Sequence, residues 1–178
     1  MMTFVRALRA AVLTATAIGL AGAVPNAAAA SRSGTTVLAL TPPVRAVLER
    51  VRIRVLYPAV VPASLEGVGI AVDAGTNNAY SLDVVASRRC IGVNTAGGAC
   101  TQATVEGQRP VGPTPRGYVP VRLPGGTRGY YHVGVCGANC EGSFQLTFVR
   151  WNARYVIGIK AGTLADGLAV VRGLRVLR

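Results

Sequence analysis

The sequence has few acidic residues and none of the short motifs that mark the common enzyme classes. Only 7 of its 178 residues are Asp or Glu; they are Glu49, Glu66, Asp73, Asp83, Glu106, Glu141 and Asp166. A glycosidase requires two carboxyl groups flanking one bond, and only Asp73 and Asp83 suggest a pair, across a hairpin. The chain also contains no G-x-S-x-G, no P-loop and no dinucleotide-binding glycine fingerprint. We therefore expect a protein that is not an enzyme and that holds no cofactor.

Lysine and histidine are also scarce. Lys160 is the only lysine among 19 basic residues, and His132 is the only histidine. With so few acids to balance the arginines, the formal net charge is +12. A charge of this size attracts polyanions over a long range, although it does not determine which polyanion is bound.

The first thirty residues have the pattern of a secretory signal peptide. Arg6 and Arg9 precede an apolar run at residues 10–24, and four alanines at 27–30 offer a small-x-small cleavage site. The run is shorter than the roughly 20 apolar residues that a membrane span needs, and no cysteine follows the site to carry a lipid. We expect residues 1–30 to be removed and the mature chain, without a transmembrane segment, to be secreted or periplasmic.

Removal of residues 1–30 from 178 leaves 148 residues, enough for one domain with a hydrophobic core. This mature chain retains 17 basic and 7 acidic residues, a net charge of +10. We expect a flexible tail at residues 31–43 and a single globular domain at residues 44–178.

The four cysteines fall into two glycine-rich turns. They are Cys90 and Cys100 in "CIGVNTAGGAC", and Cys136 and Cys140 in "CGANC". Four cysteines can pair in three ways, and exported domains usually have oxidised cysteines. Because glycine lets the backbone curl tightly, we predict the two local disulfides, Cys90–Cys100 and Cys136–Cys140.

Two other uses of these cysteines are less compatible with the spacing. A structural zinc site usually has two C-x₂₋₄-C pairs, and only Cys136 and Cys140 fit that pattern. A cysteine nucleophile with His132 as its base requires a free thiol, and an even number of cysteines leaves none obviously free. We therefore expect no metal site.

Periodicity predicts an α+β fold. Alternating residues favour three hairpins and one further strand, at 67–87, 119–136, 143–160 and 100–107. Prolines exclude a central strand from 52–65, which favours an extended edge segment there, and indicate an exposed loop at 108–118. We expect an antiparallel sheet of about five to seven strands, with one helix near each end of the chain.

The two helices are predicted from apolar residues at helical spacing. The first stripe consists of Val44, Val47, Leu48 and Val51; the second consists of Leu164, Leu168, Val171 and Leu174. Thr163 and Asp166 have the spacing of a capping box at the start of the second helix. Arg172, Arg175 and Arg178 are expected at its carboxyl end, where positive charge suits the helix dipole.

His132 lies on a predicted strand at 128–135. Tyr131, Val133 and Val135 form its apolar face, which leaves Arg128, Tyr130 and His132 on the other face. An odd-length loop or a bulge at 125–127 would add Arg122 to this polar set, whereas an even loop would place His132 beside Val119 in the core. The sequence leaves both registers open. His132 is then either a surface histidine without a function or part of a candidate patch for an anion or a sugar, made of Arg122, Arg128, Tyr130 and His132.

A second basic feature is "RVRIRV", in which Arg50, Arg52 and Arg54 alternate with apolar residues. In an extended segment the three arginines share one face. Such a face either discourages strand pairing at an edge or contacts an acidic polymer.

Several stretches together resemble small exported bacterial proteins of unknown function. These are "YPAVVP", "VRLPGGTRGYYHVGVCGANC", the hairpin with Trp151 and Tyr155, and the closing helix. The resemblance covers roughly residues 51–174. It implies an α+β fold with clipped cysteine loops, and it implies no active site.

Two functions follow from these observations, and a third is weaker. The first is a non-catalytic exported domain that associates with an anionic component of the cell envelope through its arginine-rich surface; export makes nucleic acid an improbable partner. The second is an extracellular protein-interaction or inhibitor module that presents the loop 108–118 or a clipped cysteine loop. A small secreted hydrolase would require a pocket that joins His132 to a carboxylate.

Overall fold

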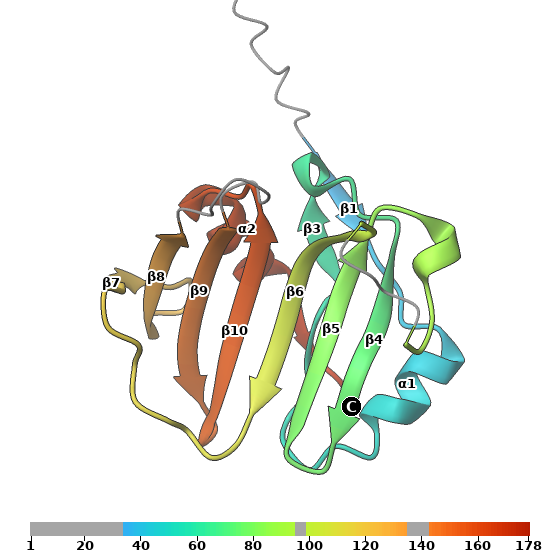
Figure 1. Ribbon diagram of the computed structural model, residues 1–178, viewed down its shortest axis with the longest axis horizontal. Helices are drawn as coiled ribbons and strands as arrows, with labels where there is room; N and C mark the ends of the chain where they lie inside the picture. The colour runs from blue at the N-terminus through green and yellow to red at the C-terminus, as the bar shows by residue number, and fades with distance from the viewer. Residues whose placement is uncertain (1–33, 95–98, 135–142) are drawn as a thin grey trace, which may run out of the picture. The chain divides into compact units, whose positions relative to one another are not determined.

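Seven segments with apolar residues at alternate positions form one antiparallel sheet in the computed structural model of the chain (Figure 1). The structure describes residues 34–94, 99–134 and 143–178, which all belong to one unit, Ser31–Arg178. The strands are β4 (Gly69–Thr76), β5 (Ala79–Val85), β6 (Thr101–Gln108), β7 (Val119–Arg122), β8 (Arg128–Gly134), β9 (Ser143–Arg150) and β10 (Ala153–Lys160). They lie in the order β4-β5-β6-β10-β9-β8-β7.

One face of this sheet, here called the inner face, packs on the hydrophobic core. Leu82, Val105, Ile157 and Leu146 lie opposite one another in β5, β6, β10 and β9, and each is 0% exposed. Because side chains alternate along a strand, the residues between them point to the other face, here called the outer face.

Two helices and four short strands of the described residues flank or cover the inner face. They are β1 (Thr35–Val37), α1 (Pro42–Leu48), β2 (Leu56–Pro58), β3 (Val60–Pro62), α2 (Leu164–Gly173) and β11 (Leu174–Val176). β1 pairs with β3, and β11 pairs with β2. α2 contacts β9 and β10, whereas α1 contacts β4; in Figure 1, α2, β1 and β3 lie behind the sheet. Two short 3₁₀ turns, Ala63–Leu65 and Arg88–Cys90, complete the fold.

The α+β class is confirmed, and the main sheet has seven strands, the upper end of the expected range. The prolines at 58 and 62 lie in two-stranded ladders outside the main sheet, as their lack of a backbone N–H predicts. No helix among the described residues is both long enough and apolar enough to cross a membrane.

The predicted end of the second helix is wrong. α2 ends at Gly173, and the chain turns extended at Leu174 to form β11, so Arg175 and Arg178 are not helical. At Gly173 the helix touches the backbone of β3, because an added Cβ would lie 1.8 Å from the Val60 carbonyl oxygen. Short apolar runs such as "LRVL" fit a helix and a strand equally well.

The predicted tail at residues 31–43 contains a short strand in its described part. Residues 35–37 form β1 against β3, and Leu38 is only 4% exposed.

The first helix begins at Pro42 and ends at Leu48, so Val51 lies outside it. Proline suits the first helical turn because its missing N–H has no intrahelical partner there.

Two hairpins show where turns and register place their residues. In the turn between β9 and β10, Trp151 and Asn152 both have positive φ angles, 51° and 55°, so β10 begins at Ala153. In the first hairpin, Asp83 lies opposite Ala71, and the register shifts between Val72 and Ala74. Asp73 and Asp83 therefore do not occupy paired positions on the two strands.

Candidate functional site: the outer face and the arginine end of the sheet

The register of β7 and β8 is the one that brings the four predicted patch residues to the same face. Arg122 lies opposite Arg128, and Pro120 lies opposite Tyr130. The connection, residues 123–127, has an odd number of residues, and Gly125 and Gly126 both have φ angles of 83°, a conformation that glycine adopts without strain. Tyr131, on the inner side, lies opposite Leu146. Arg122, Arg128, Tyr130 and His132 therefore all point to the outer face.

Arg122 and Arg128 line a shallow depression at the end of this hairpin. Its volume is about 370 Å³, and its lining also includes Pro120, Val121 and Gly126. The guanidinium carbon of Arg128 lies 5.3 Å from the centre of the Tyr130 ring. No ion pair joins either arginine to a carboxylate in the described parts of the chain. Like charges directly opposite each other on paired strands are destabilising, so an anion bound between them would relieve repulsion.

His132 is half-buried beneath a tyrosine. The ring of Tyr118 stacks on it at 5.3 Å, and the Tyr118 hydroxyl donates a hydrogen bond to Gln145 Oε1. Gln145 lies opposite His132 on β9. The nearest carboxylate along the same face in the described residues is on Glu106, three strands away, or about 14 Å. No group of three or more potential metal ligands occurs in the described ranges, and Glu141 lies outside them.

Two buried polar side chains lie beside this patch on the outer face. Thr147, opposite Tyr130, is 4% exposed, and Arg154 is 8% exposed. Among the described residues, Thr147 Oγ1 and Arg154 Nε have no hydrogen-bond partner. Arg154 Nη2 donates to the carbonyl of Gly112, so the predicted loop 108–118 crosses this face. Buried polar atoms without partners are unusual and call for an explanation.

The alternation expected for Arg50, Arg52 and Arg54 is confirmed, although their segment is not a strand. All three are exposed, whereas Val51 is partly buried, and Ile53 and Val55, which flank Arg54, are 3% and 4% exposed. The backbone N–H of Arg52 donates to the carbonyl of Asn77 at 2.7 Å, in the turn between β4 and β5. The segment therefore runs past the turn end of the sheet.

A cluster of arginines surrounds Trp151 in the turn between β9 and β10. The guanidinium carbons of Arg54 and Arg150 lie 4.8 Å and 4.2 Å from the centre of its ring. Arg109 Nη2 donates to the Trp151 carbonyl at 2.6 Å, and Arg109 Nε donates to the Asn152 carbonyl at 2.7 Å. Cation–π contacts and these hydrogen bonds hold the positive charges close together.

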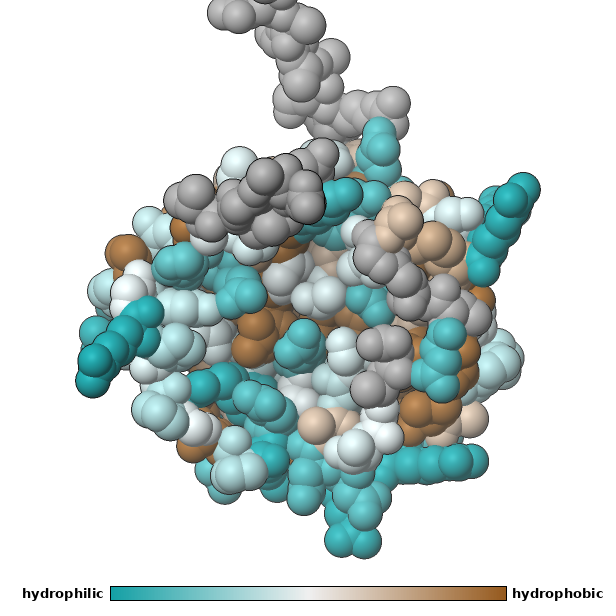
Figure 2. Space-filling model, in the orientation of Figure 1, coloured by the Kyte–Doolittle hydropathy of each residue, from teal (hydrophilic) through white to brown (hydrophobic). Residues whose placement is uncertain are grey.

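These features lie at the same end of the sheet, because neighbouring strands are antiparallel. The β4–β5, β7–β8 and β9–β10 turns and the carboxyl end of β6 meet there. We call this the arginine end; it comprises Arg52, Arg54, Arg109, Arg122, Arg128 and Arg150. No Asp or Glu occurs in the segments that form it, which are 50–55, 76–79, 108–118, 122–128 and 149–153. Figure 2 shows hydrophilic side chains gathered along this lower edge of the molecule.

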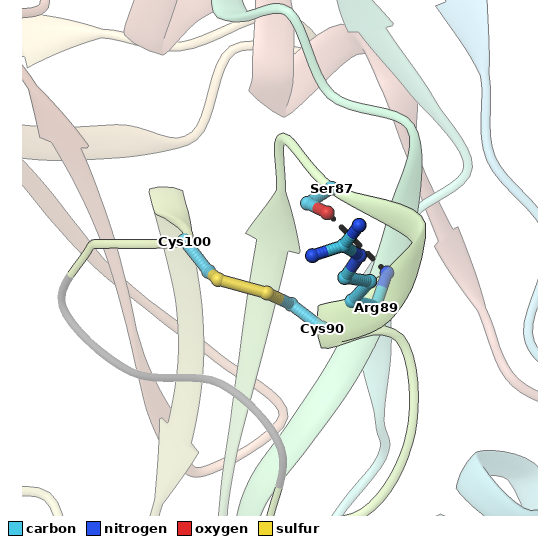
Figure 3. The surroundings of a disulfide bond; sticks show 4 residues. All are labelled: Ser87, Arg89, Cys90 and Cys100. Atoms are coloured by element: carbon cyan, nitrogen blue, oxygen red, sulfur yellow. Dashed lines mark hydrogen bonds between the residues drawn. A yellow bond between two sulfur atoms is a disulfide. The ribbon is translucent and has the colours of Figure 1, made fainter.

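One of the two predicted disulfides is confirmed. Cys90 and Cys100 are bonded, with Cα atoms 6.3 Å apart (Figure 3). The bond closes the connection from β5 to β6, and Cys90 packs with Ala71 and Val85 in a small second cluster. Closing a loop of this length contributes about 2.8 kcal/mol by the chain-entropy relation. Cys136 and Cys140 lie outside the described residues.

The sequence analysis missed several residues of this site. Strand register, which the sequence left open, brings four of them to the site: Tyr118, Gln145, Thr147 and Arg154. The pairing of β6 with β10 brings Arg109 there. The sequence "RW" at the third hairpin was a usable signal for Arg150 and Trp151.

Comparison with known proteins gives no match to a protein-family model, to a curated protein or to a solved structure. The resemblance to small exported bacterial proteins therefore stays a prediction.

Proposed function

We propose that this protein is an exported, non-catalytic domain that binds an anionic polymer of the cell envelope through its arginine end. The observation that carries the proposal is the convergence of six arginines, from four separate segments, at one end of the sheet without an acidic residue in those segments. A surface of one sign focuses its field and attracts a polyanion. Guanidinium groups also bind phosphate and carboxylate oxygens in pairs.

The packing around Trp151 supports the same function. The backbone carbonyls and the indole ring hold Arg54, Arg109 and Arg150 in place. Such side chains lose less rotamer freedom when a polymer binds, so more of the binding energy is retained. Their charges also repel one another, and a bound polyanion lowers that cost.

Binding to immobilised polyglutamate at increasing salt concentration tests the proposal. Each arginine that contacts the polymer releases counterions, so the logarithm of the affinity should fall linearly with the logarithm of the salt concentration. The variant Arg52→Gln/Arg54→Gln/Arg150→Gln should reduce that slope by about 2, at about 0.7 per contact as measured for single-stranded nucleic acids.

A control variant with the same loss of charge is Arg88→Gln/Arg89→Gln/Arg172→Gln, whose positions lie away from the arginine end. It should change the slope by much less than the first variant does. Equal effects of the two variants, or salt-insensitive binding, would contradict the proposal. Binding that disappears when Cys90–Cys100 is reduced would instead favour an interaction module that uses the disulfide-closed loop.

A further inference from the structure

We infer that the polymer is built of acidic sugars, and that the outer face of the β7–β8 hairpin binds one acidic sugar unit between Arg122 and Arg128 and against the ring of Tyr130. The inference rests on the proposed function, because Arg122 and Arg128 belong to the arginine end.

The first step is the pair of arginines. They occupy directly opposite positions on β7 and β8 and both line the depression of about 370 Å³. Since no described carboxylate neutralises them, the two guanidinium groups form a preformed site for one oxyanion. The depression is open and shallow, which suits one unit of a longer chain.

The second step is the row of rings beside the arginines. Along β8, Arg128 is followed on the same face by Tyr130 and then by His132, whose ring is stacked with Tyr118. Aromatic side chains offer an apolar face together with a polar edge. A sugar ring has the matching surface, since its C–H groups can pack on a ring while its hydroxyl groups point outward.

The third step is the supply of hydrogen-bonding groups on the neighbouring strand. Thr147 lies opposite Tyr130, and Gln145 lies opposite His132. The Thr147 hydroxyl is buried, so the accessible group of the two is the exposed Gln145 amide, which retains its N–H donors. Sugar hydroxyls accept hydrogen bonds as well as donate them, so they can bind these donors. A polyphosphate would use the arginines and leave the aromatic rings unused.

The test compares two carboxylate polymers that have the same number of charges, polygalacturonate and polyglutamate, by isothermal titration calorimetry at fixed salt. We expect the protein to bind polygalacturonate at least tenfold more tightly. Tyr130→Leu should bring this ratio close to one, because it should weaken the binding of polygalacturonate much more than that of polyglutamate. Tyr130→Phe keeps the ring and should keep the ratio. Arg122→Gln/Arg128→Gln should weaken binding of both polymers.

A second measurement uses the unmodified protein, so it does not require any variant to fold. His132 is the only histidine, so its ring protons give resolved NMR signals from the site. Trigalacturonate should shift these signals in the unmodified protein, and their invariance at saturation would overturn the inference.

The outcomes separate this inference from the proposed function. Equal, salt-dependent affinities for the two polymers would overturn the acidic-sugar site and leave the polyanion function intact. Failure to bind either polymer would overturn both.

Discussion

Tyr80 illustrates how a single buried side chain ties the covering layer to the sheet. Its hydroxyl accepts a hydrogen bond from the Leu56 N–H at 2.8 Å and donates one to the Leu56 carbonyl at 3.0 Å. Burial is the main reason that the pKa of Tyr80 lies far above its ordinary value, so the hydroxyl stays protonated. β2 is thereby fixed against β5 although it is not part of the main sheet.

Tyr80→Phe should therefore lower the free energy of unfolding by about 1–3 kcal/mol, because both backbone groups of Leu56 would remain buried without this partner. Urea unfolding measures the change. Tyr57→Phe is the matched control, since the Tyr57 hydroxyl makes no hydrogen bond to any described residue. A Tyr80→Phe protein as stable as this control would show that the two hydrogen bonds contribute little.

At the scale of single elements, the best-defined boundary is the start of α2. Thr163 Oγ1 accepts a hydrogen bond from the Asp166 N–H, and the Asp166 carboxylate accepts one from the Thr163 N–H, which completes a capping box. Partial burial of Asp166 raises its pKa, but hydrogen bonds from Thr163 and Ser64 outweigh this effect, so the net pKa is lowered. The carboxylate is thus the stabilising form.

Thr163→Ala should cost about 1 kcal/mol of unfolding free energy through loss of this cap.

Asp166→Asn should also be less stable than the unmodified protein at neutral pH. Because the folded-state pKa of Asp166 is lowered, its contribution is complete above the ordinary value of 3.8 and is lost as the pH falls below it. Unfolding measured from pH 7 to pH 2 should show the unfolding free energies of Asp166→Asn and of the unmodified protein converging at the acidic end. A constant difference would point to another cause.

The elements also show which parts of the fold can be predicted from the sequence. The three hairpins are local, and the alternation of residues such as Phe144, Leu146 and Phe148 marks the buried face directly. β11 and β2 have only three residues each and pair across more than a hundred positions of the chain, so no local pattern reveals them. The sequence identified the four residues of the patch. The face on which Arg122 joins the β8 residues depends on the length of the connection at 123–127.

At the scale of the whole molecule, the charge pattern depends on long-range pairing. Arg54, Arg109 and Arg150 are distant in the sequence, and their proximity follows from the order β6-β10-β9 and from the path of the segment 50–55. A count of charges predicts attraction to polyanions, whereas the location of the charges at one end follows only from the topology.

Export remains the prediction on which the biological setting depends. Intact-mass analysis of protein from its native host should give the mass of a chain that begins at Ser31, and its four cysteines should be oxidised. Mild reduction followed by alkylation provides the control, because it should then label all four thiols. A full-length mass with four free thiols would contradict both the cleavage and the proposed location.

The connection between β7 and β8 has a consequence for how such proteins diverge. β8 is held in place by β9, so deleting one residue from 123–127 would move every β7 side chain to the opposite face. Arg122 would turn toward the core, and Val121 would take its place outside. A one-residue change in this turn would therefore remove ligand recognition in evolution. It would do so without substituting any amino acid that touches the ligand.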